Sequence, residues 1–366
     1  MTSTVRDTAA VVGIGMTTLS RNSGFSVLEL AVQAAELALE DAGLTAADVD
    51  AVLSYHMNDS APVPYVARSL GIGRLGWHNE IYGGGTQAAS ILGDAAMLIS
   101  SGLARRVLVF RALNGRSGKR MSQVPLRVGA GAEEQFTLPY GMLGPVHLFA
   151  LAARRWLSDR GLGTEVLSDV VINSRARAAG NPRALLRKPM TIEEYLASPM
   201  VAEPLRRVDC CLETDGAAAL IMAPARDVPD APRMHAVVRG GDGGSSTMDK
   251  TDDVSRIFSA YLAPSLYRAA GMTPRDVDVA MLYDAYSFLV LAQLEDFGFC
   301  DRGEPPGLPG PDGPLVNPNG GLLSEGYVHG LNNVLEAIRQ LRAGASVALV
   351  TGFGGSYGSA AILTRS

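Results

Sequence analysis

Apolar residues recur along this chain with two different periods, and this pattern predicts both helices and strands. In residues 27–43, VLELAVQAAELALEDAG, they follow helical spacing, and Gly43 is a stop signal. In residues 106–110, RVLVF, and 346–350, SVALV, they run almost without interruption, as in strands buried on both faces. Strands that alternate with helices predict an α/β fold in which helices cover the sheets.

The same patterns occur twice in the same order. The segment AGLTAADVDAVLSYH at 42–56 matches AGMTPRDVDVAMLYD at 270–284 without a gap. Three similarities in one order predict that the chain consists of two related halves, and the other two pairs are 10–18 with 236–244 and 100–115 with 341–355.

The segment between these halves is richer in Pro and Arg and has no counterpart in the second half. We therefore expect an N-terminal half at 1–115, an inserted loop or lid region with the return to the first half at 116–230, and a C-terminal half at 231–366.

Composition narrows the class of protein. The 366 residues are 47% hydrophobic and 19% charged, which is typical of a folded globular protein. A formal net charge of -5 argues against a general nucleic-acid binder. The sequence shows neither a basic leader with an apolar run nor a membrane-length apolar stretch, so we expect a cytoplasmic protein. Three cysteines without a CxxC pair predict no disulfide framework or zinc ribbon in this chain, and we interpret Cys210, Cys211 and Cys300 as small buried residues.

Four longer stretches resemble the thiolase superfamily, and they lie at 181–222, 283–300, 317–333 and 352–359. The resemblance covers nearly the whole chain and is strongest to the branch with the thiolase domain of sterol carrier protein X and bacterial lipid-transfer relatives. It implies a thiolase fold, in which duplicated βαβαββ halves form a layered α-β-α-β-α structure with an inserted loop domain.

The chain departs from the thiolase pattern where thiolases keep their catalytic groups. The nucleophilic cysteine is replaced in IYGGGTQAAS at 81–90, and the second cysteine would fall near Thr351 or Gly352. Tyr327 stands at the histidine of the usual Gly-His-Pro, and Tyr283-Asp284-Ala285-Tyr286 replaces another catalytic motif. Chemistry through an acyl-cysteine is therefore not expected.

These substitutions resemble those of the steroid side-chain aldolases, which are thiolase-fold lyases. The resemblance implies retro-aldol cleavage of a β-hydroxyacyl-CoA. The expected substrate is a 17-hydroxy steroid with a three-carbon acyl-CoA side chain, and the products are a 17-keto steroid and propionyl-CoA.

The residues fit this reaction better than two other retro-aldol routes. Lys119, Lys188 and Lys250 lie in no apolar motif that would favour a Schiff base, and the five histidines lack metal-ligand spacing. A thioester enolate needs neither, because hydrogen-bond donors can hold its oxygen. Tyrosine has an ordinary pKa of about 10 and acts as a base only where its surroundings stabilise the phenolate.

We expect Tyr283 and Tyr327 to share the proton transfers, in either order, with His329 and Asp284 orienting them. Predicted pocket or oxyanion residues are Tyr82, Gly84, His147, Gly320, Gly321, Gly354 and Tyr357. Structural roles compete with these: Tyr55 occupies the place of Tyr283 in the repeat and is compatible with a core position, and Asp284 is compatible with a helix cap.

Two other functions are open at this point: a non-catalytic acyl-CoA or sterol carrier, and another thiolase-fold enzyme on a β-hydroxy or β-keto acyl-CoA. Polar Tyr283, Tyr327 and His329 favour an enzyme. The resemblance also implies a homodimer and a small OB-fold partner with a zinc ribbon, together a heterotetramer. This chain is expected to bind no cofactor or metal, since coenzyme A arrives with the substrate and zinc would belong to the partner.

Overall fold

One mixed sheet organises the chain in the computed structural model, which describes residues 5–118, 120, 136–142, 144–243, 251–301, 313–355 and 357–365. Within these residues the sheet has ten strands in the order β10-β9-β11-β12-β8-β1-β7-β4-β2-β3. Five of these strands belong to the first half of the repeat: β1 (Ala9–Met16), β2 (Ala51–His56), β3 (Trp77–Tyr82), β4 (Val107–Asn114) and β7 (Asp215–Pro224). Their counterparts are β8 (Arg233–Gly241), β9 (Val279–Met281), β10 (Leu315–Val316), β11 (Val347–Gly354) and β12 (Tyr357–Thr364).

The order of the strands reads the same in both directions from the junction of β1 with β8. In each half the last strand, β7 or β12, is antiparallel to both of its neighbours. The second strand, β2 or β9, is parallel to both of its neighbours. The duplication predicted from the sequence is therefore present in the topology.

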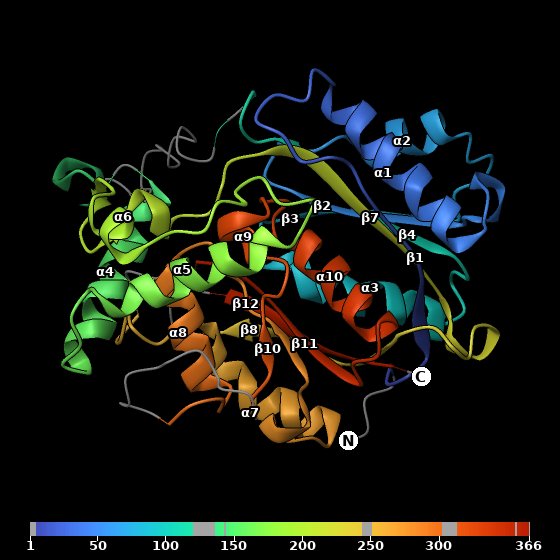
Figure 1. The fold of residues 1–366 in the computed structure, drawn as a ribbon. Coiled ribbons are helices and arrows are strands. Elements are labelled where there is room, and N and C mark those ends of the chain that lie inside the picture. Colours follow the sequence, from blue (N-terminus) through green and yellow to red (C-terminus); the bar gives the residue numbers. More distant parts are fainter. Residues whose placement is uncertain are drawn as a thin grey trace.

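Helices form three layers around these strands (Figure 1). Between the halves lie α3 (Gln87–Ser100) and α10 (Leu331–Arg342), and each packs against strands of both halves. The outer layers are α1 (Val27–Ala42) with α2 (Val63–Leu70), and α7 (Phe258–Ala270) with α8 (Ser287–Asp296). The predicted α-β-α-β-α layering is confirmed.

Local signals in the repeated segment explain why both halves fold alike. Gly43 and Gly271 end α1 and α7 in the left-handed conformation, which glycine adopts without the clash that a Cβ would cause. The Asp50 carboxylate then accepts hydrogen bonds from the backbone N–H groups that begin β4, and Asp278 does the same at β11. The DVD motif thus fastens two neighbouring strands in each half.

The predicted insertion leaves the first half after β4 and returns to it at β7. It contains α4 (Pro145–Asp159), α5 (Val166–Ala179), α6 (Ile192–Leu196) and the hairpin of β5 (Met200–Ala202) with β6 (Leu205–Arg206). Its helices pack on α8 and on the short α9 (Gly321–Ser324), so the insertion covers the second half (Figure 1). The prediction of a lid over a pocket goes beyond this packing and stays a prediction.

Candidate active site

Tyr283 and Tyr327 meet in the interior, although 44 residues separate them in the sequence. Their hydroxyl oxygens lie 2.7 Å apart, at hydrogen-bond distance. Tyr283 is 2% exposed and Tyr327 is 7% exposed. The two phenols predicted to share proton transfer therefore form a buried pair with one hydroxyl donating to the other.

Buried hydrogen bonds hold the backbone of both tyrosines. The Tyr283 N–H donates to Thr351 Oγ1 at 2.8 Å, and the Tyr283 carbonyl accepts from Gln293 Nε2 at 2.9 Å. The Tyr327 N–H donates to Thr214 Oγ1, and that hydroxyl donates to the Tyr327 carbonyl at 2.8 Å. Because all four backbone groups are engaged, the phenols have little freedom to separate.

The glycine turn that leads into α3 lies directly against this pair. A Cβ added at Gly85 would overlap Tyr283 Oη, and a Cβ added at Gly84 would lie 3.5 Å from His329 Nε2. At Gly85 only glycine allows the backbone to approach Tyr283 so closely. The resemblance places the thiolase nucleophile within residues 81–90, and Tyr283 lies against Gly85 of that segment.

Burial keeps both phenols protonated. It raises the pKa of Tyr283 and Tyr327 well above the usual value, and negative charge on the neighbouring Cys211 or tyrosine would raise it further. The geometry therefore favours two neutral phenols over a tyrosinate base.

His329 adjoins the pair and is held by two charged residues. Its ring centroid lies 4.9 Å from that of Tyr327. Arg111 Nε donates to His329 Nδ1 at 3.1 Å, and Arg111 Nη2 pairs with Asp59 Oδ2 at 2.7 Å. Burial and the Arg111 charge lower the pKa of His329 to about 3, so the imidazole is neutral. Although burial opposes it, Arg111 holds the pKa of the Asp59 carboxyl below its ordinary value.

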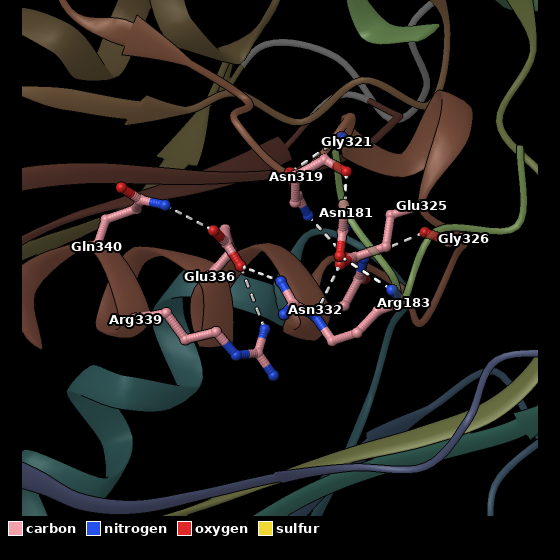
Figure 2. Close-up of polar contacts among 10 residues, drawn as sticks. All are labelled: Asn181, Arg183, Asn319, Gly321, Glu325, Gly326, Asn332, Glu336, Arg339 and Gln340. Atoms are coloured by element: carbon pink, nitrogen blue, oxygen red, sulfur yellow. Dashed lines mark hydrogen bonds and ion pairs between the residues drawn. The ribbon is translucent and has the colours of Figure 1, made fainter. Parts of the chain in front are cut away.

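A buried carboxylate fixes the loop that carries Tyr327 (Figure 2). Glu325 accepts hydrogen bonds from Asn181 at 2.9 Å, Asn319 at 2.7 Å and Asn332 at 3.0 Å. These three amides come from the loop after α5 in the insertion, from the loop before α9 and from α10. One side chain thus joins three parts of the chain two residues before Tyr327.

Asp284 binds the backbone and not the phenols. Its carboxylate accepts from the N–H groups of Leu322 and Leu323 at 2.9 and 3.2 Å, in the first turn of α9. Burial raises its pKa to about 7. The structure therefore shows the capping interaction that the sequence offered as the alternative role of Asp284.

The two predicted oxyanion glycines before α9 have other partners. The Gly320 N–H donates to the Asn317 carbonyl, and the Gly321 N–H donates to Asn319 Oδ1. Both have positive φ, and a Cβ at Gly321 would overlap the Asp284 carboxylate. Because both amides are engaged, neither is an available donor in this structure.

Three other predicted pocket residues gather at one cavity. Tyr82, Gly354 and Tyr357 line a space of about 520 Å³ at the start of α3, together with Gly83, Thr86, Gln87, Arg239 and Gly240. Gly83 lines this space, and Gly85, two residues later, lies against Tyr283. His147 lies apart from these residues in the sequence, in the first turn of α4, where its Nδ1 is 3.3 Å from the Gly144 carbonyl oxygen. Membership of an acyl-CoA pocket stays a prediction for all four.

Residues for the competing chemistries are placed as follows. Lys188 is exposed and pairs with Glu194, whereas Lys119 and Lys250 lie outside the described residues. Cys211 packs against the cluster that holds the tyrosines, and burial raises the pKa of its thiol well above the usual value. Among the described residues, no group of three or more His, Cys, Asp or Glu side chains is arranged to hold a metal ion.

The sequence reasoning missed Arg111, Asp59 and Gly85. Arg111 had a usable signal, because it interrupts the apolar run of β4, and a charge in a buried strand requires a partner. Asp59 stands in an ordinary polar loop. Gly85 is one of three consecutive glycines in the sequence, and its contact with Tyr283 depends on the tertiary structure.

Comparison with known proteins gives consistent matches. Residues 245–365 match the family model described as Thiolase C-terminal domain-like. The chain is 37% identical over 370 residues to the 17-hydroxy-3-oxo-4-pregnene-20-carboxyl-CoA lyase of Mycobacterium tuberculosis, covering 94% of both proteins. It is 36% identical to the steroid side-chain-cleaving aldolase of Thermomonospora curvata, covering 93% of this chain and 91% of the relative.

Solved structures agree with these matches. A chain of the structure titled Ltp2-ChsH2(DUF35) aldolase superposes with a TM-score of 0.91 at 32% identity and covers 99% of both chains. The monomeric SCP2-thiolase like protein type 1 of Mycobacterium smegmatis gives 0.78 at 21% identity, covering 100% of this chain and 78% of that one, which is a likeness of fold alone. Within the part of the chain that is described, no helix combines the length and apolar character needed to span a bilayer.

Proposed function

The chain belongs to the thiolase-fold family of steroid side-chain-cleaving aldolases, and from this premise we propose the reaction and substrate that its own site serves. The protein is a retro-aldol carbon–carbon lyase acting on a β-hydroxyacyl-CoA. Its substrate is a 17-hydroxy steroid with a three-carbon acyl-CoA side chain, in line with the activity named for the Mycobacterium tuberculosis relative. The products are a 17-keto steroid and propionyl-CoA.

The contact between the two phenols carries this proposal. In a retro-aldol cleavage the β-hydroxyl loses a proton, the Cα–Cβ bond breaks, and its electron pair passes to the thioester as an enolate. Cα gains a proton in the same concerted step, so enolate charge develops only while the Cα–Cβ bond is breaking. Two phenols joined at 2.7 Å can move that proton in a relay, because each phenol gives up one proton as it accepts another. No phenolate has to form, which agrees with the raised pKa of both hydroxyls.

A covalent acyl-enzyme plays no part in this mechanism. A cysteine nucleophile reacts as the thiolate, and burial keeps the Cys211 thiol protonated. Gly85 occupies the space beside Tyr283 that a larger side chain would need. The enzyme therefore cleaves the bond by proton transfer and by stabilising the enolate, not by acyl transfer.

We extend the proposal to assembly. The similar solved structure has a title that names a second component, ChsH2(DUF35). We infer that this chain takes a small partner of that kind, with an OB-fold and a zinc ribbon, and that it pairs with a second copy of itself to give a heterotetramer. The strand β3 supports the pairing, because it lies at the end of the sheet and Trp77 and Tyr82 are 43% and 51% exposed.

The test is cleavage by the purified chain, alone and with a DUF35-type partner. Incubation with the 17-hydroxy steroid acyl-CoA should release equal amounts of 17-keto steroid and propionyl-CoA, measured by liquid chromatography with mass detection. The variant Cys211→Ala should keep this turnover. Tight binding of the substrate by the complex without release of ketone would contradict the proposal and identify a carrier.

A further inference from the structure

One ring nitrogen of His329 has no hydrogen-bond partner among the residues that the structure describes. This atom, Nε2, is buried. The whole side chain is 0% exposed. A buried N–H without a partner costs free energy, so its presence beside the phenols calls for a ligand.

The other ring nitrogen determines which proton the ring carries. Arg111 is a donor only, and its Nε and Nη2 both lie against His329 Nδ1. Nδ1 must therefore be the acceptor. Burial and the Arg111 charge keep the imidazole neutral, so its single proton sits on Nε2. His329 thus presents an N–H group at the orphaned position.

Several contacts fix this ring in place. Arg111 is itself 0% exposed, and its remaining Nη2 hydrogen bond goes to Asp59. The backbone of His329 has a φ of 47°, in the left-handed region, and its carbonyl accepts from Tyr55 Oη at 3.0 Å. A non-glycine residue in this conformation is strained and stays there only because the surrounding structure holds it.

Gly84, which lacks a side chain, lies beside Nε2. A Cβ at Gly84 would lie 3.5 Å from Nε2 and 3.0 Å from Met57 Sδ. Gly84 and Met57 are both partly exposed, so this is the side from which a substrate can approach. The next residue, Gly85, abuts Tyr283, which brings the donor and the phenols to adjacent points of one turn.

We propose that the His329 Nε2–H donates a hydrogen bond to the thioester oxygen of the acyl-CoA and strengthens it as the enolate forms, with Arg111 and Asp59 as positioning residues that select this tautomer. This inference rests on the proposed aldolase function and adds the oxyanion donor that Gly320 and Gly321 do not supply. The phenols transfer the protons, and His329 holds the developing charge.

The first test reads the tautomer without reference to activity. Protein labelled with 15N-histidine has only five histidines, so ring correlation spectra can be assigned by comparison with His329→Gln. We expect one ring with a proton on Nε2 and a bare Nδ1 at pH 7. In Arg111→Gln this pattern should give way to mixed tautomers, whereas the surface variant Arg105→Gln should keep it. A proton on Nδ1 in the native protein would overturn the inference.

The second test measures turnover in the complex with its partner. His329→Phe should lower kcat about 10²- to 10³-fold, as loss of one oxyanion donor does, with KM changed only a few-fold. His329→Gln should recover part of this loss because its amide carries an N–H. Gly84→Ala, which fills the space beside Nε2, should lower kcat while leaving the tautomer unchanged.

The outcomes separate the two proposals. Active native enzyme with full kcat in folded His329→Phe, or in folded Gly84→Ala, would overturn the role of His329 and leave the aldolase function standing. Native enzyme that shows the Nε2 tautomer but releases no ketone would refute the aldolase function. If His329→Phe does not fold, the spectra and the two milder variants still decide.

Discussion

Tyr55 and Tyr283 occupy the same position in the two halves of the repeat, but their hydroxyls do different things. Tyr55 follows the DVD motif in β2, is fully buried and donates to the backbone carbonyl of His329. Tyr283 follows the same motif after β9 and meets the phenol of Tyr327. One tyrosine thus binds main chain, and the other binds a group that can itself exchange protons.

The comparison shows that the repeat determines where each tyrosine lies. The group that accepts or donates a hydrogen bond at its hydroxyl determines what the tyrosine can do chemically. Up to the tyrosine both segments make the same interactions, including the aspartate that fastens the neighbouring strands. Beyond the tyrosine the two segments differ, because the loop at 325–330 contacts both tyrosines. Its His329 carbonyl accepts from Tyr55, and its Tyr327 hydroxyl meets that of Tyr283. A repeat position therefore predicts burial but not function.

The strongest test of the different roles of Tyr55 and Tyr283 is the effect of each on turnover. Tyr283→Phe should lower kcat about 10²- to 10⁴-fold, the usual range for loss of an acid or base group. The matched variant Tyr55→Phe should cost about 1–3 kcal/mol of unfolding free energy, because it leaves a buried carbonyl unpaired, and should lower kcat less than tenfold. Steady-state kinetics and denaturant unfolding check both. Equal losses of kcat would end the distinction between the two tyrosines.

The residues that follow the two tyrosines, His56 and Asp284, differ in burial, and this difference predicts how stability depends on pH. His56 is partly exposed, whereas Asp284 is buried with a pKa raised to about 7. Its unfolded pKa is about 3.9. The contribution of protonated Asp284 to the free energy of unfolding is therefore fully present below about pH 4. This contribution decreases above pH 4 and is lost as the pH rises through 7. Relative to Asp284→Asn, the native protein should lose up to about 4 kcal/mol of unfolding free energy between pH 4 and 7.5. Parallel stability curves for the two proteins would contradict the raised pKa.

The turn beside Tyr283 offers a steric test. Gly85→Ala places a Cβ against Tyr283 Oη and the Phe353 carbonyl, so it should cost about 1–3 kcal/mol of stability and separate the phenols. We expect kcat to fall by more than the loss of folded protein explains. Gly73→Ala is the control, because a Cβ there meets open space and its φ is not positive. Full activity in folded Gly85→Ala would show that the turn does not position Tyr283.

The smallest expected effects come from the aspartate that the two halves have in common, Asp50 in the first half and Asp278 in the second. Asp50→Ala and Asp278→Ala each remove a carboxylate that accepts two neighbouring backbone N–H groups. Each should cost about 1–2 kcal/mol, and the losses should add in the double variant because the sites are far apart. Thermal and denaturant unfolding measure this. Unequal losses, or a kcat changed more than twofold in either variant, would show that the halves are not equivalent even here.

Much of the fold was predictable because its determinants are local. Helical spacing with a glycine stop predicts α1, continuous apolar runs predict β4 and β11, and the repeated segment predicts the symmetric sheet. Tyr283 and Tyr327 were also predicted, because they replace catalytic groups of the family that the motifs resemble. Each of these inferences uses a short sequence pattern, or the comparison of two such patterns, and needs no tertiary contact.

The rest of the site depends on contacts that no local pattern contains. Arg111 and His329 are 218 residues apart, and only folding reveals that one determines the tautomer of the other. The amides of Gly320 and Gly321 resemble oxyanion donors in the sequence, yet backbone and side-chain acceptors already use them. The rise in the pKa of both phenols likewise follows from burial, which depends on the tertiary structure.

The central claim is that two neutral phenols pass the proton from the β-hydroxyl to Cα. It is tested most directly by the single-turnover rate of the native complex in mixtures of light and heavy water. A relay through Tyr283 and Tyr327 moves several exchangeable protons together, so the rate should fall along a downward-bowed curve as the deuterium fraction rises. A straight line, indicating a single proton in flight, would contradict the relay.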